Sequence, residues 1–82
     1  MTMEIYAIKD TKVAYNLPFY QHNQAEAQRN FAAAVRDTNG IMSKNPADFE
    51  LWKLGTYDDE TGLIYGGQPC YICSGMEVVN RG

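Results

Sequence analysis

The sequence predicts an α+β fold: a small antiparallel sheet of about three to five strands with one helix packed on one face. Two patterns support this prediction. Residues 23–40 carry apolar side chains at helical spacing between two recognisable helix ends, whereas residues 3–9 and 49–65 have the character of strands and turns. Because 82 residues make one small domain, we expect a single domain over 1–82, with a partly irregular tail over 66–82.

The bulk composition is that of a soluble globular protein, with 45% apolar and 21% charged residues. No apolar run approaches the ~20 residues that a membrane-spanning helix needs, and the first residues lack the pattern of a signal peptide. We therefore expect no membrane partner and a cytoplasmic location. The formal net charge of −3 argues against strong, sequence-independent binding to nucleic acids, because that affinity comes mainly from Lys and Arg.

The first predicted strand covers residues 3–9, and both of its faces are apolar. One face carries Met3, Ile5 and Ala7, and the other carries Tyr6 and Ile8. After a turn at 10–12, we expect residues 13–15 to pair back as a short second strand. Pro18 cannot donate to a strand ladder, so we interpret residues 16–21 as an extended connection along the surface.

The helix is predicted to begin after Asn23, a favoured N-cap, with Glu26 at the spacing of a capping box. Its apolar stripe consists of Ala27, Phe31, Ala34 and Val35. We expect the pair at 39–40, Asn-Gly, to end the helix, since both residues tolerate the left-handed backbone region. Arg29 and Arg36 share roughly one helix face, which is either a solvated surface or a phosphate contact.

Residues 49–57 form the central predicted strand, and both of its alternating sets of side chains contain large apolar groups. One set is Phe49, Leu51, Lys53 and Tyr57, and the other is Trp52, Leu54 and Thr56. A short helical turn at 46–48 is expected before this strand. A turn at 58–62 is expected to lead into a return strand at 63–65.

The tail is harder to assign, because two glycines and a proline interrupt the strand pattern after residue 65. We expect residues 66–75 to be irregular and residues 76–79 to form a short edge strand or an arm that contacts a partner. Cys70 and Cys73 are interpreted as two small, half-buried side chains rather than as a zinc or redox site, because the chain lacks two further zinc ligands close by.

A sheet with apolar side chains on both faces needs a cover on each face. The helix covers one face, and the other is expected to meet a second subunit, a second layer of the chain or a ligand. We predict a homodimer. The predicted interface residues are Tyr6, Ile8, Trp52 and Leu54.

The residues required for common enzyme chemistry are missing. The sequence has one histidine, His22, and neither a glycine-rich phosphate loop nor a nucleophile motif. The three acids at 58–60 suit a turn better than a metal site, which needs more ligands than the turn supplies. We therefore predict a protein that is not an enzyme, with no catalytic residue, no metal and no cofactor.

Three signatures occur in order along the chain. The first is Asp10-x-Lys12 followed by Tyr15 and Pro18-Phe19, and the second is Asn23 leading into the helix with Arg29 and Phe31. The third is Asn45-Pro46-x-Asp48-Phe49-x-Leu51-Trp52-x-x-Gly55-x-Tyr57-Asp58-Asp59-x-Thr61-Gly62. Together, over roughly residues 3–65, they resemble the small nonstructural protein of gokushoviruses, a group of Microviridae phages with circular single-stranded DNA genomes.

This resemblance implies a DNA-binding protein that assists genome replication or packaging, acts in the host cytoplasm and is not part of the mature virion. Sites for single-stranded DNA commonly combine a positive groove with aromatic rings on which bases stack. The candidate nucleic-acid-binding residues are Lys9, Lys12, Arg29, Arg36, Lys44, Lys53, Tyr15 and Tyr20. Packing in the core or a dimer is the other interpretation of most of the aromatic residues. The alternative function is a protein-interaction adaptor for a viral replication or capsid protein, without nucleic-acid contact.

Overall fold

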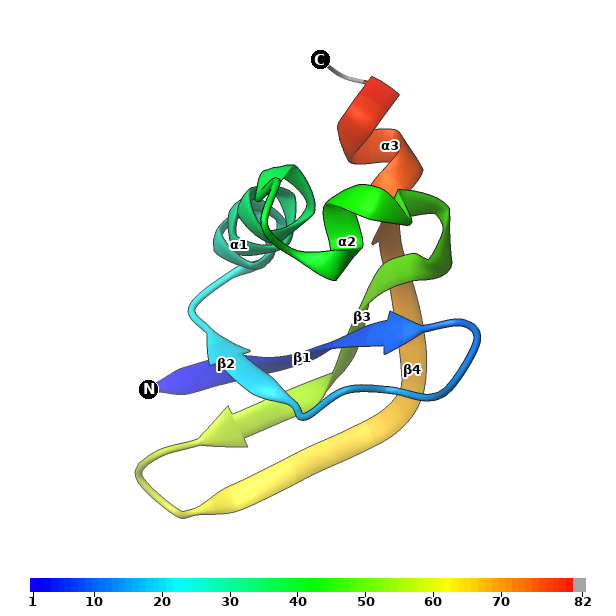
Figure 1. Ribbon diagram of the computed structural model, residues 1–82. Coiled ribbons are helices and arrows are strands. Elements are labelled where there is room, and N and C mark those ends of the chain that lie inside the picture. Colours follow the sequence, from blue (N-terminus) through cyan, green and yellow to red (C-terminus); the bar gives the residue numbers. More distant parts are fainter. Residues whose placement is uncertain (81–82) are drawn as a thin grey trace.

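The computed structural model, which describes residues 1–80, has the predicted α+β architecture. Over these residues the chain forms a four-stranded antiparallel sheet in the order β2-β1-β3-β4. The strands are β1 (Thr2–Asp10), β2 (Phe19–Gln21), β3 (Phe49–Asp58) and β4 (Leu63–Ser74). The helical elements are α1 (Gln24–Arg36), α2 (Ile41–Lys44), η1 (Pro46–Asp48) and α3 (Gly75–Asn80). Figure 1 shows that these helical elements gather on one side of the sheet.

The main helix, α1, forms as the sequence predicts. The Asn23 side chain accepts a hydrogen bond from the Glu26 backbone N–H at 2.9 Å, which satisfies one of the free donors of the first turn. The helix ends at Arg36, before the predicted stop at 39–40, because Asp37 leaves the helical conformation. Of the predicted stripe, Ala27, Phe31 and Val35 are buried.

The core lies between α1 and the sheet. Its largest fully buried side chains are Tyr6, Phe31, Leu51 and Val35. Ala27, Phe49, Cys73 and Val78 complete the buried cluster, so that β1, β3, β4, α1 and α3 all contribute to it. Burial of such side chains stabilises the fold by roughly 1.5–3 kcal/mol each.

An extra residue in β3, Leu54, interrupts the alternation of side chains along this strand. Tyr6 of β1 pairs with Lys53 and Ile5 pairs with Gly55, so Leu54 has no partner in β1. Such a β-bulge reverses the faces of all later side chains relative to the earlier ones. Residues 56–58 therefore lie on the faces opposite to those that simple alternation predicts.

Gly55 is the residue that permits the two strands to approach at this bulge. A Cβ at position 55 would overlap the carbonyl oxygen of Tyr65 in β4. Glycine in a strand often marks such a close approach between two backbones. The bulge in β3 and the bend of β4 beside it therefore depend on glycine here.

The second strand differs from the prediction. β2 consists of Phe19–Gln21, which pair with residues 4–6 of β1, whereas 13–15 contribute only the single bridge between Tyr15 and Lys9. Pro18 directly precedes β2, so its missing N–H lies outside the ladder. The Phe19 ring stacks on Tyr6 with a centroid distance of 6.2 Å, which ties this strand to the core.

The prediction for the tail was wrong. β4 continues to Ser74, and α3 follows in place of an edge strand or arm. The Ser74 hydroxyl accepts a hydrogen bond from the Glu77 N–H at 3.3 Å, which is an N-cap contact. The buried side chain of Val78 anchors α3 to the core. Pairing with β3 and this cap stabilise a segment whose glycines and proline predicted irregular structure.

The β3–β4 turn forms where it was expected. The Asp58 side chain accepts a hydrogen bond from the Glu60 N–H at 2.9 Å, and the Gly62 N–H donates to the Asp58 carbonyl at 2.8 Å. Gly62 has φ 77°, a conformation that favours glycine. Asp58 thus begins a locally hydrogen-bonded turn that ends at Gly62. The predicted short helical turn at 46–48 is also present as η1.

Candidate nucleic-acid interface

The sheet face opposite α1 carries five aromatic side chains, which we call the aromatic face. They are Tyr15, Tyr20, Trp52, Tyr57 and Tyr71. Trp52 pairs with Ala7 of β1 and Tyr57 pairs with Met3. Because Met3 and Ala7 are an even number of residues apart on β1, their partners share one face.

Three of these rings form a cluster around Lys9. The Trp52 ring meets Tyr15 edge to face at a centroid distance of 6.0 Å and meets Tyr71 in the same manner at 5.7 Å. The Lys9 ammonium lies 5.2 Å from the centre of the Tyr15 ring and 5.1 Å from the centre of the Trp52 ring. Both distances are within the range of a cation–π contact, so Lys9 binds to the cluster itself.

Two carboxylates accept hydrogen bonds from rings of the same cluster. The Trp52 indole N–H donates to Glu50 at 2.9 Å, and the Tyr71 hydroxyl donates to Glu77 at 2.6 Å. The hydrogen bond to Glu77 raises the pKa of Tyr71 above its ordinary value of 10.0, with burial as the second cause. These contacts orient the rings, and they place two carboxylates against the cluster that Lys9 contacts.

The other two rings of the aromatic face form a separate pair. Tyr20 of β2 and Tyr57 of β3 have a centroid distance of 5.6 Å and an interplanar angle of 45°. Tyr20 is 52% exposed, Tyr71 41% and Tyr15 39%, whereas Trp52 and Tyr57 are half-buried. Three tyrosine rings are therefore accessible to a flat partner such as a nucleobase.

The predicted cations do not converge on this face. Among the predicted lysines and arginines within residues 1–80, only Lys9 forms a cation–π contact with the aromatic face. Lys12 lies in the exposed loop after β1. Arg29, Arg36 and Lys44 are exposed on α1 and α2, which lie on the other side of the sheet.

Lys53 also lies on the helix side of the sheet. Its ammonium forms an ion pair with Glu4 at 3.3 Å, and the Tyr6 hydroxyl donates to the same carboxylate at 2.5 Å. The Tyr6 hydrogen bond, followed by Lys53, lowers the pKa of Glu4 below its ordinary value of 4.5. Burial and the Glu4 carboxylate raise the pKa of Tyr6. Lys53 is therefore already neutralised within the subunit.

The four predicted interface residues do not form one exposed surface. Tyr6 is fully buried and Ile8 packs against the same core, so both belong to the helix side. Trp52 is half-buried between Tyr15 and Tyr71 on the opposite side. The prediction assigned Tyr6 and Trp52 to one face, but the strand register pairs Tyr6 with Lys53, the neighbour of Trp52. Adjacent strand residues point to opposite faces.

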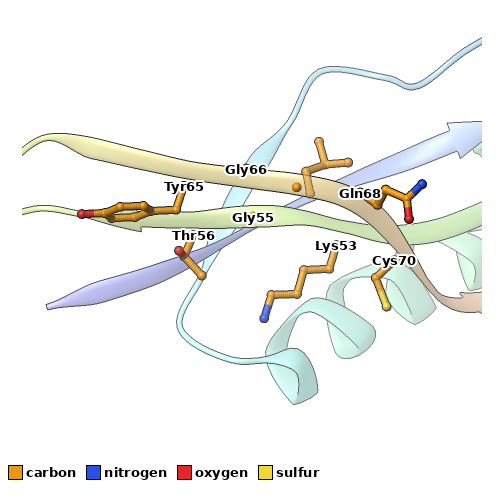
Figure 2. A pocket seen from close by; sticks show the side chains of 9 residues that line it. Lys53, Gly55, Thr56, Tyr65, Gly66, Gln68 and Cys70 are labelled. Carbon is orange, nitrogen blue, oxygen red and sulfur yellow. The ribbon is translucent and has the colours of Figure 1, made fainter.

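Leu54 lines an open pocket of about 220 Å³ between β3 and β4. Figure 2 shows Lys53, Thr56 and Cys70 extending from this hairpin toward one side. Lys53 and Thr56 share this side because their partners in β1, Tyr6 and Glu4, are two residues apart. Cys70 is exposed, whereas Cys73 is buried in the core.

Neither Tyr57 nor Tyr71 was among the predicted site residues, and Tyr71 is the one whose segment was assigned wrongly. It lies in the segment that was expected to be irregular. The sequence contains a signal that identifies this segment, because Ser74 and Glu77 have the spacing of a capping box. A helix beginning after Ser74 leaves Tyr71 and its neighbours as the preceding strand.

Residues 1–80 contain neither a cluster of metal ligands nor a membrane-spanning helix. No group of three or more His, Cys, Asp or Glu side chains is arranged as a set of metal ligands in this part of the chain. None of the helices described there is long and apolar enough to cross a membrane.

Comparison with known proteins gives one match. The family model described as Phage ORF5 protein matches residues 3–78. No curated protein and no solved structure matches the chain. The family match covers β1 through most of α3, and therefore includes every residue of the aromatic face.

Proposed function

This chain belongs to the Phage ORF5 protein family, and we propose that this phage-encoded protein binds single-stranded DNA weakly through its aromatic face. The observation that supports the proposal is the set of exposed tyrosines on the sheet face that the helices leave uncovered. Open sheet faces with aromatic side chains are a common platform for unpaired bases, because every base has a flat surface on which a ring can stack.

Stacking is the main source of affinity in this proposal. Each base that stacks on an aromatic ring contributes ~1–3 kcal/mol. Tyr20 and Tyr71 are exposed and belong to opposite edge strands of the sheet, so a strand of DNA that contacts both would cross β1 and β3. Two half-buried rings of β3 pack against these exposed rings: Tyr57 contacts Tyr20, and Trp52 contacts Tyr71.

Electrostatic attraction is weak in the same proposal. Lys9 faces the rings, but Glu50 and Glu77 accept hydrogen bonds from the same cluster. If one or two phosphates are neutralised, the logarithm of the DNA-binding constant falls as the logarithm of the salt concentration rises. The slope is then only about −0.7 to −1.4. Weak binding with a shallow salt dependence distinguishes this arrangement from a basic DNA-binding groove.

The biological setting is part of the proposal. The ordered signatures at residues 10–19, 23–31 and 45–62 support a narrower assignment to the nonstructural proteins of gokushoviruses within Microviridae. In that setting, the protein acts without enzymatic activity in the host cytoplasm, where it assists replication or packaging of a single-stranded genome. It is not a component of the mature virion.

The test is a titration of a fluorescent single-stranded oligonucleotide at low and at moderate salt. We expect weak binding at low salt that decreases only slightly as salt rises. Duplex DNA of the same length is the control, since its bases are stacked within the helix and do not reach the tyrosines. No binding of the single strand at low salt, or equal binding of the duplex, would refute the proposal.

A second candidate function is an adaptor that contacts a viral replication or capsid protein. The net charge of −3 and the dispersed cations fit a protein partner at least as well as DNA. A failed oligonucleotide titration, together with retention of a phage replication or capsid protein by the immobilised chain, would select this function.

A further inference from the structure

The outer edge of β4 is a second surface whose features the proposed function does not explain. β4 is the last strand of the sheet, so one side of its backbone has no partner strand within residues 1–80. In Figure 1, β4 extends as a straight segment from the turn and then bends before α3. Residues 63–67 lie in this straight part, directly after the turn.

Residues 63–67 of this edge lack several of the usual protections against association, although the pairing of β4 with β3 shifts register next to them. Proteins commonly protect an edge strand with charged side chains, with proline or by keeping it very short. All twelve residues of β4 are uncharged, and Pro69 lies beyond residues 63–67. By contrast, the opposite edge strand, β2, has three residues. Three consecutive side chains of the straight part are also exposed, namely Leu63, Ile64 and Tyr65 at 51%, 63% and 55%.

No steric conflict within the subunit requires glycine at positions 66 and 67, although Gly66 pairs with Gly55 beside a register shift between β3 and β4. A Cβ at Gly66 or at Gly67 would meet nothing within 4 Å, and neither residue has a positive φ. Gly55, Gly62 and Gly75 differ, because a close backbone contact or a positive φ requires glycine there. Glycine within a strand often marks a bulge or the close approach of another backbone, and the open space at Gly66 and Gly67 leaves room for a backbone from another molecule.

We infer that residues 63–67 of β4 pair antiparallel with the same residues of a second copy of this chain. A two-fold axis places each residue opposite a residue of the same short segment. Any charge in that segment would therefore face a like charge, which destabilises a strand pair. The uncharged edge of a chain with net charge −3 meets this requirement of self-pairing.

The pairing has a consequence for the aromatic face. When the two-fold axis is perpendicular to the sheet, antiparallel pairing joins the two four-stranded sheets into one continuous sheet. Equivalent faces of the two copies then point in the same direction. The two aromatic faces then lie side by side, and the helices of both copies lie on the other side. Only this consequence rests on the proposed function. The pairing itself holds or fails independently of DNA binding.

The experiment measures the oligomeric state of the full chain by sedimentation velocity at micromolar concentrations. We expect the unmodified chain to be a dimer. Tyr65→Lys and Tyr65→Glu change the centre of the segment, which lies at the two-fold axis, and each variant alone is expected to be a monomer. An equimolar mixture of the two variants is expected to form a dimer again, because opposite charges then meet. Val13→Lys adds the same charge in the exposed loop after β1 and should remain a dimer.

Three outcomes would overturn the inference. The unmodified chain could sediment as a monomer, Tyr65→Lys could remain a dimer, or the mixture of the two variants could stay monomeric. Circular dichroism of each variant shows whether it is folded, and the half-exposed position of Tyr65 makes folding of both expected. Failure of the oligonucleotide titration with a dimeric chain would remove the proposed function and leave the strand pairing intact.

Discussion

Trp52 and Tyr57 lie on the same face of the sheet although they are an odd number of residues apart in one strand. The cause is Leu54, which has no partner in β1 and shifts the later residues by one position. This shift brings Tyr57 next to Tyr20 at 5.6 Å on the face that also carries Trp52. The aromatic face therefore includes Tyr57 because of one extra residue.

The bulge should depend on Gly55. We expect Gly55→Ala to destabilise the protein by about 1–3 kcal/mol, because the new methyl group overlaps the Tyr65 carbonyl and forces the strands apart. Urea unfolding at low protein concentration measures the change. Gly67→Ala is the matched control, since its Cβ meets open space, and it should change stability by less than about 0.5 kcal/mol or increase it slightly. Equal effects of the two substitutions would show that the close approach at Gly55 is unimportant.

The core should depend on Phe31, which α1 directs into the buried cluster. Phe31→Ala is expected to cost about 3–5 kcal/mol through lost burial and the cavity left behind. For a domain of this size that loss approaches the whole stability, so the variant should be largely unfolded by circular dichroism. Arg29→Ala, on the exposed side of the same helix, should leave the unfolding midpoint almost unchanged. A folded Phe31→Ala variant of normal stability would contradict the assigned core.

The start of α1 should depend on the Asn23 cap. Asn23→Ala removes the acceptor for the Glu26 N–H and is expected to cost about 1 kcal/mol. Asn23→Asp keeps an acceptor in the same place, so it should retain most of the stability. Thermal unfolding of the two variants beside the unmodified chain gives the comparison, and equal losses would mean that the cap contact contributes nothing.

The Glu4 contact should make stability depend on acid pH. The folded-state pKa of Glu4 is lowered by the Tyr6 hydroxyl and by Lys53, so its contribution is present above the ordinary value of 4.5 and is lost as pH falls below it. The unmodified chain should exceed Glu4→Gln in stability by less than about 1 kcal/mol at neutral pH, because the pair is partly exposed. This difference should shrink in acid. Urea unfolding across pH measures it, with Glu26→Gln as a control away from Lys53, and a difference independent of pH would refute the assignment.

Binding of single-stranded DNA should depend on the exposed rings. Tyr71→Ala is expected to weaken oligonucleotide binding by about 1–3 kcal/mol, which is the contribution of one stacked base. Tyr71→Phe keeps the ring and loses the hydrogen bond to Glu77, so it should bind nearly as well as the unmodified chain. Arg36→Ala, on the helix side, should also bind normally. Loss of binding in Arg36→Ala but not in Tyr71→Ala would place the DNA on the other side of the molecule.

Local features of this protein were predictable from the sequence. The N-cap at Asn23, the buried positions Ala27, Phe31 and Val35, and the turn ending at Gly62 all follow from interactions between residues close in the chain. Such interactions are predictable because the spacing of helix side chains and the conformation of glycine depend on residues only four or five positions apart. The α+β class followed from the same local patterns.

The faces of the sheet were decided only by the tertiary structure. Alternation assigns side chains correctly until a bulge occurs, and the bulge at Leu54 arises from pairing with β1, which is distant from β3 in the sequence. The same holds for β4, where pairing with β3 orders a segment rich in glycine, and for Lys53, whose partner Glu4 comes from β1. Contacts between distant segments thus determine which rings share a face and which cations remain available.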